Sequence, residues 1–150
     1  MNIKGVTLDG LDKIIAKMEH LSGEKLVGKG LEKTADLVQG EAKLLAPVGS
    51  PKYGGGDLRD SIKVSDVKDR QIEVFTNCDH ALFNEFGTGT KGDPAVPHTS
   101  KEKWVYKGTD GSFHTSYGMA PRPFMRPAAE KGRTLIGDVF DEVYKEALEE

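Results

Sequence analysis

Apolar residues recur every three or four positions in three parts of this 150-residue chain, which is the spacing of one face of an α-helix. The first part covers 8–21 and ends at a Ser-Gly pair. The second covers 26–45 and is closed by Pro47, and the third runs from about Pro123 to the C-terminus. The pattern predicts two N-terminal helices and a long C-terminal helix. Their apolar positions are Leu8, Leu11, Ile14, Ile15, Met18 and Leu21; Leu26, Leu31, Ala35, Val38, Ala42 and Leu45; and Ala128, Leu135, Val139, Phe140, Val143 and Ala147.

Glycine interrupts the second predicted helix at Gly28, Gly30 and Gly40. Each glycine weakens a helix by up to ~1 kcal/mol relative to alanine. Packing against the rest of the protein, or against a partner, must therefore hold this helix in place. Small residues also allow a neighbouring element to approach closely.

Between the helices the pattern changes to that of short strands. A helical turn over 57–62, which Asp57 can cap, leads into a strand that ends near Val64. A second strand is expected over 71–76, and the polar segment 66–69 suits the turn between the two strands. Two strands alone are marginal in water, so they need the helices as a cover.

Two short motifs, 81–90 and 120–129, flank a mostly polar insertion at about 88–120. Each motif joins large apolar residues to glycine or proline, which fix how a chain leaves one element and enters the next. The segment 79–86 is predicted to be a short helix that Gly87 ends. Its apolar face is expected to carry Ala81, Leu82, Phe83 and Phe86.

The insertion is predicted to be a β-hairpin arm, because 104–106 and 113–115 flank a polar stretch that turns at Asp110 and Gly111. The fold class is therefore α+β, with two N-terminal helices, a small antiparallel β-sheet with an extended β-hairpin arm, and a long C-terminal helix. No repeat or shift in composition divides the chain, so we expect residues 1–150 to form a single domain.

Composition indicates a thin core, since 37% of the residues are hydrophobic and 30% are charged. Such a core can be completed against partner subunits, although composition fits a well-solvated monomer equally well. The net charge of −3 argues against a protein that wraps nucleic acid, because phosphate binding needs clustered Lys and Arg. A toxin–antitoxin or other nucleic-acid-binding module would need a basic face that this composition does not provide.

Cys78 is the only cysteine, which excludes an intrachain disulfide and fits a reducing compartment. As a nucleophile it would need a base such as His80, and the end of a strand is the simpler interpretation. The N-terminus lacks the pattern of a signal peptide, and no segment has the ~20 apolar residues of a membrane span. We expect a cytoplasmic protein without a membrane partner.

The candidate catalytic patterns lack the context that their chemistry requires. Residues 87–92 match G-x-G-x-x-G, but the prolines that follow cannot open the helix that binds a pyrophosphate. The histidines show no metal-ligand spacing, and the serines lie outside a G-x-S-x-G elbow. We expect no enzyme activity, metal or cofactor; the alternative is a small enzyme or an inhibitor-type regulator that uses Glu85 or His80 as acid or base. The residues considered are His20, His80, His98 and His114, and Ser61, Ser112 and Ser116.

Glu85 belongs to the first motif, and Arg122 and Arg126 belong to the second. If the motifs meet in space, Glu85 can pair with one of these arginines, in a bidentate contact if the geometry allows, and lock the base of the arm. The alternative is that Glu85 faces water.

At these motifs the chain resembles a family of small tailed-bacteriophage neck proteins, known as head-to-tail joining or minor tail components. The likeness lies, in order, in 46–47 with 56–62, in 83–88 and in 123–128. The loop 49–55 is longer than in the family pattern, so the contact that this loop makes is the part of the resemblance least applicable to this chain. The positions that match are Leu58, Arg59, Phe83, Glu85, Phe86, Gly87, Pro123, Phe124, Arg126 and Pro127.

The resemblance implies a structural role without catalysis. The expected assembly is a hexameric or dodecameric ring at the head–tail interface, in the neck or as a tail-completion ring, through which DNA passes during packaging and ejection. A tail-terminator-type ring is the alternative. Its partners would be further copies of this chain, head-closure or adaptor proteins, and tail-terminator or tail-tube proteins. The protein would lie in the host cytoplasm during assembly and in the mature virion. The arm would contact neighbouring subunits through Trp104, Tyr106, Phe113 and Tyr117.

Overall fold

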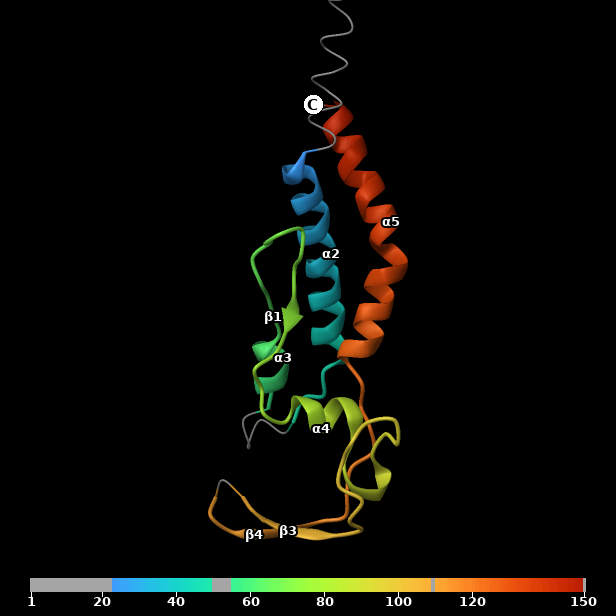
Figure 1. Ribbon diagram of the computed structural model, residues 1–150. Coiled ribbons are helices and arrows are strands. Elements are labelled where there is room, and N and C mark those ends of the chain that lie inside the picture. Colours follow the sequence, from blue (N-terminus) through green and yellow to red (C-terminus); the bar gives the residue numbers. More distant parts are fainter. Residues whose placement is uncertain (1–22, 50–54, 109, 150) are drawn as a thin grey trace, which may run out of the picture.

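A computed structural model describes residues 23–49, 55–108 and 110–149 (Figure 1). Two long helices form the body: α2 covers Glu24–Leu45 and α5 covers Met125–Glu149. They lie side by side and run in opposite directions (Figure 1). Both confirm helices predicted from the apolar spacing, whereas the predicted helix over 8–21 lies outside the described residues.

The remaining elements are short and lie beside or below this helix pair. In Figure 1 the first hairpin lies next to α2, and the second hairpin lies beyond α4, away from both long helices. Each hairpin is antiparallel, so the α+β fold class is confirmed. In chain order the elements are α3 (Asp57–Ser61), β1 (Lys63–Val64), β2 (Val74–Phe75), α4 (Ala81–Phe86), the 3₁₀ turn η2 (Gly89–Lys91), β3 (Trp104–Lys107) and β4 (Phe113–Ser116).

The strand predicted over 71–76 is wrong in extent, because β2 contains only Val74 and Phe75. Before it, the chain makes a tight turn in which Lys68 and Gln71 pair with each other. Asp69 and Arg70 form the turn with positive φ angles of 51° and 59°. Neither residue is a glycine, so the sequence does not indicate that the backbone is left-handed here.

Asp57 is not the cap of α3, contrary to expectation. The residue before α3 is Gly56, whose φ of 118° suits glycine, and no side chain hydrogen-bonds to that end of the helix. Gly87 does end α4 as predicted: its N–H donates to the carbonyl of Phe83 at 2.9 Å, and its φ is 74°.

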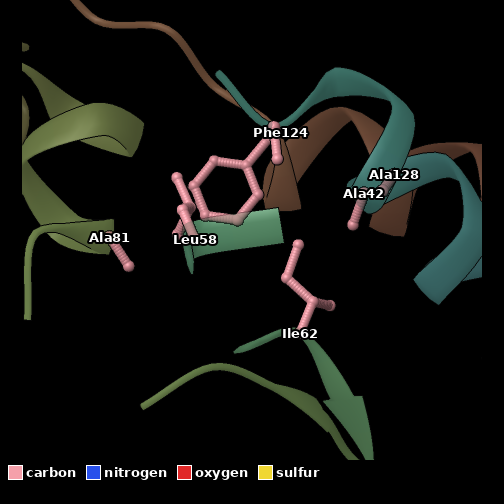
Figure 2. Close-up of a cluster of buried hydrophobic side chains, with 7 residues drawn as sticks. Ala42, Leu58, Ile62, Ala81, Phe124 and Ala128 are labelled. Atoms are coloured by element: carbon pink, nitrogen blue, oxygen red, sulfur yellow. The ribbon is translucent and has the colours of Figure 1, made fainter. Parts of the chain in front are cut away.

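The core is thin and built largely from small side chains. Figure 2 shows Phe124, Leu58 and Ile62 close together, between α3 and the ends of the two long helices. This cluster is where the second motif enters the body, because Phe124 directly precedes α5. The cluster consists of Ala42, Ala46, Leu58, Ile62, Ala81, Phe124 and Ala128, and a smaller one of Leu26, Val143 and Ala147 joins the other ends of α2 and α5.

Two predicted apolar faces are partly wrong. On α2, Leu45 is exposed and Ala46 after it is buried. On α4, Leu82 and Phe83 are 66% and 54% exposed, and the buried residues are Ala81 and Glu85. The short helix therefore turns a carboxylate inward and large apolar side chains outward.

Close helix packing explains one of the weakening glycines in α2. A Cβ atom at Gly30 would lie 2.5 Å from the ring of Phe140 on α5. Gly132 of α5 packs in the same way against Val38 of α2. By contrast, a Cβ at Gly28 or Gly40 would meet no described atom within 4 Å.

We predict opposite effects of alanine at two glycines of one helix. Gly30→Ala should lower the free energy of unfolding by about 1–2 kcal/mol, because the strain against Phe140 exceeds the gain in helix propensity. Gly28→Ala, the matched control, should raise it by about 0.5–1 kcal/mol. Urea denaturation followed by circular dichroism measures both, and equal effects at the two sites would contradict this packing.

Candidate functional site

Glu85 lies at the centre of the contact between the two motifs. It is only 5% exposed, and its carboxylate accepts hydrogen bonds from three successive backbone N–H groups at the start of α5. Phe124 and Met125 donate to Oε2 at 2.8 and 2.9 Å, and Arg126 donates to Oε1 at 3.0 Å. A side chain from α4 therefore caps a helix that begins about forty residues later in the chain.

The sequence before α5 explains why this cap comes from elsewhere. Residues 120–124 contain no Ser, Thr, Asp or Asn, the residues that usually accept these N–H groups. A helix starts with four N–H groups that lack partners within the helix. Glu85 takes those of Phe124, Met125 and Arg126, and Pro127 at the fourth position has no N–H. The negative carboxylate is also favoured at the positive end of the helix dipole.

Arg126 extends this contact to α4 and to the insertion. Its Nε donates to Glu85 Oε1 at 3.1 Å, and its Nη2 donates to the backbone carbonyl of Glu85 at 3.2 Å. Its Nη1 forms an ion pair with Asp93 Oδ2 at 2.9 Å. The guanidinium also lies 4.7 Å from the ring centre of Phe86. We call Glu85, Arg126 and Asp93 the clamp.

The structure confirms the predicted pairing of Glu85 with an arginine and selects between the two candidates. Arg126 makes the pair, although with one guanidinium nitrogen on the carboxylate instead of two. The Arg122 N–H donates to the Asn84 carbonyl at 2.7 Å, which is a backbone contact of the same junction. The alternative in which Glu85 faces water is wrong.

The electrostatics of the clamp favour its charged form. Burial alone would raise the pKa of Glu85, but the backbone N–H donors of residues 124–126 and the Arg126 side chain outweigh it and lower this pKa. The pKa of Asp93 is also lowered, first by the N–H of Ala95 and then by Arg126. The pKa of Arg126 is raised by hydrogen bonds to Asp93 and Glu85.

The two sides of the insertion meet immediately beyond the clamp. Thr88 and Met119 exchange backbone hydrogen bonds of 2.8 and 3.1 Å. Gly87 is required there, because its φ is positive and a Cβ atom would lie 2.5 Å from the Met119 carbonyl oxygen. Gly87 and Gly89 of the G-x-G-x-x-G pattern therefore belong to a crossing of two chain segments, and the 3₁₀ turn that follows is not the helix of a dinucleotide site.

Beyond this crossing, β3 and β4 form the predicted arm, which turns at Gly111 with a φ of 80°. One face of the hairpin is partly anchored by Trp104, which is half-buried near Gly89. On the same face Tyr106 stacks on His114 of the paired strand, with ring centres 5.6 Å apart. Val105 and Phe113 lie on the opposite face, and Phe113 is 76% exposed.

The other motif residues fall into two groups. Leu58 and Phe124 are buried core residues. Arg59 is exposed and pairs with neighbouring Asp60 at 3.2 Å. Pro123, Pro127, Phe83 and Tyr117 are also exposed. Their part in assembly stays a prediction.

Two clusters near histidines were not predicted. At the arm tip, Ser112 Oγ lies 2.8 Å from His114 Nε2, and Asp110 contacts both groups. Asp110 approaches the same ring nitrogen as the serine, so it does not orient the imidazole as in a catalytic triad. Cys78 Sγ also lies 3.2 Å from His80 Nδ1, a contact that sequence spacing did not guarantee.

The described part of the chain has no group of three or more His, Cys, Asp or Glu residues placed to hold a metal ion. Among residues 23–49, 55–108 and 110–149, no helix is long and apolar enough to span a membrane.

We predict that Glu85→Gln lowers the free energy of unfolding by about 2–3 kcal/mol at neutral pH, because three N–H groups and Arg126 lose a charged acceptor. The loss should shrink as the pH falls. The pKa of Glu85 is lower in the folded protein than its ordinary value of 4.5, so the carboxylate adds stability above that pH. This added stability disappears as the pH drops through the folded pKa.

Urea denaturation of wild type and variant between neutral pH and pH 3 measures this difference. Exposed Glu73 provides the control, since Glu73→Gln should change stability by less than ~0.5 kcal/mol. A Glu85→Gln effect that is small, or that stays constant over the pH range, would contradict the role given to the clamp.

The comparisons with known proteins agree with the resemblance seen in the motifs. Residues 12–87, just over half of the chain, match the model of the HK97-gp10-like family, described as a bacteriophage HK97-gp10 tail component. The match includes Glu85 and ends at Gly87, where the arm begins. No curated protein and no solved structure matches the chain. The chain belongs to the HK97-gp10-like family of bacteriophage tail components.

Proposed function

We propose that the protein is a non-enzymatic ring subunit at the head–tail interface of a tailed phage, as a neck or tail-completion component. Membership of a phage tail-component family supports a structural role in the virion. The observation that carries the finer proposal is the arm, a hairpin with an exposed apolar face whose base is clamped to the long helices.

The arm is poorly suited to remain in water alone. A two-stranded hairpin is marginally stable by itself, and Val105, Phe113 and Tyr117 are more than half exposed. Exposed apolar patches of this kind commonly mark protein–protein contacts. The clamp fixes the direction of the arm, so a partner can dock on it without first having to order its base.

A ring can form if the arm of one copy docks on a different surface of the next copy. The arm lies beyond α4, away from the two long helices, which leaves those helices open to the arm of another copy (Figure 1). Such head-to-tail contacts close into rings when the rotation between subunits allows it. The resemblance favours a hexamer or dodecamer, with head-closure or adaptor and tail-terminator or tail-tube proteins as neighbours. A net charge of −3 suits a channel through which DNA passes without being held.

The alternative of a small enzyme loses its strongest candidate residue. Glu85 is committed to four hydrogen bonds from the start of α5, and its lowered pKa does not suit a general acid at neutral pH. His80 is exposed and contacts Cys78, with no further polar group arranged for catalysis among the described residues.

We predict that replacing residues 102–117 by a Ser-Gly turn leaves a folded protein but abolishes rings. Lys101 and Gly118 both approach Gly89, so a short turn can join them while Glu85, Arg126 and Asp93 are retained. Mass photometry and negative-stain microscopy would show rings for wild type and monomers for the variant. Circular dichroism would confirm that the helices remain, and intact rings of the variant would overturn the proposal.

A further inference from the structure

One side of α2 presents apolar residues that the described chain covers only in part. Leu37 and Leu44 are 47% and 82% exposed and lie one heptad apart, with Gly40 between them. Together with Asp36 and with Gly132 and Leu135 of α5 they line a hollow of about 250 Å³. The ion pair of Glu41 with Lys131, 2.6 Å long, also lines it, so Asp36 is the lining charge that has no ion-pair partner among the described residues. We call this surface the Gly40 hollow.

Gly40 is one of two glycines of α2 without a packing partner in the described chain; the other is Gly28, and only Gly40 lies between two exposed leucines. Gly30 is accounted for by the ring of Phe140, but a Cβ at Gly40 would meet no described atom within 4 Å. The helix therefore gives up stability at Gly40 without an internal packing gain. Because Gly40 has no side chain, there is open space between Leu37 and Leu44. An aromatic ring from a partner would fill this space.

The chemistry of the unanchored arm face complements this hollow. The strand register places Lys107 opposite Phe113, so a cation and an exposed aromatic ring share that face. Both charged groups are available, because neither Lys107 nor Asp36 has an ion-pair partner among the described residues. An arm that inserts Phe113 between Leu37 and Leu44 can bring Lys107 toward Asp36.

The arm in question belongs to another copy. Within one chain, α4 and the crossing of Thr88 with Met119 separate the arm from α2 (Figure 1). The clamp keeps the arm pointing away from its own helices. A neighbouring subunit can bring its arm to the hollow without such a restriction.

We propose that the Gly40 hollow is the seat for the Phe113 face of the arm from a second copy of this chain. This inference rests on the proposed function, in which the arm joins copies, and adds the surface on which it docks. In this contact the ring of Phe113 is buried, and beside it Lys107 of one copy pairs with Asp36 of the other.

The test is a matched pair of substitutions in α2. Gly40→Gln fills the hollow with a side chain that favours a helix, and Gly28→Gln makes the same change at another open position. Both variants should unfold at temperatures no lower than wild type. Gly40→Gln should raise the concentration needed for half-assembly at least about tenfold, as expected for loss of one central contact, whereas Gly28→Gln should leave it unchanged.

Crosslinking tests the contact directly. In a Cys78→Ala background, mixing Leu44→Cys chains with Phe113→Cys chains should give a heterodimer with a short bis-maleimide. Leu82→Cys, exposed but away from the hollow, should not crosslink to Phe113→Cys. The proposed docking site would be overturned if Gly40→Gln assembles at the same concentration as wild type and Leu44→Cys does not crosslink to Phe113→Cys. If the arm replacement still abolishes rings, the proposed function survives that result; if it does not, both fail.

Discussion

The arrangement of the molecule depends on one buried carboxylate. Glu85 satisfies the N–H groups that α5 cannot satisfy from its own sequence, and Arg126 ties the same carboxylate to α4 and to Asp93. Unpaired N–H groups at a buried helix end carry a free-energy penalty of about 1–3 kcal/mol each. The start of α5, the end of α4 and the base of the arm are therefore fixed by a single set of contacts.

The two long helices, α2 and α5, are held together by few large side chains. Alanine makes up half of the residues in the two buried clusters, and glycine allows close approach at Gly30 and Gly132. Some large apolar side chains are not buried, among them Leu44 on α2 and Phe113 on the arm. A chain that buries little by itself and exposes apolar residues at two separate places is well suited to assembly, as expected of a phage tail component.

Sequence periodicity predicted the two described long helices, and the Asp110-Gly111 turn predicted the arm, because both signals arise from local backbone preferences. The face of α4 could not be predicted in the same way. Hydrophobicity favoured burial of Leu82 and Phe83, but the demand for an acceptor at the start of α5 placed Glu85 inside instead. That demand depends on a contact between residues distant in the sequence.

A signal for the clamp was nevertheless present. No capping residue precedes α5, which indicates that the acceptor for its first N–H groups is not local in the sequence, whereas Pro127 at the fourth position needs none. The pairing of Glu85 with an arginine was predicted, whereas the backbone contacts that dominate it were not. The shortness of β2 was also unpredictable, because Asp69 and Arg70 adopt positive φ angles without being glycine.

Hydrogen exchange at the amides of Phe124, Met125 and Arg126, followed by NMR, tests the central claim most directly. Amides in the first turn of a helix usually exchange quickly because they lack partners within the helix. If Glu85 caps α5, these three amides should be protected to a degree comparable with amides in the middle of α5. Fast exchange at all three, with the interior of α5 protected, would contradict the account.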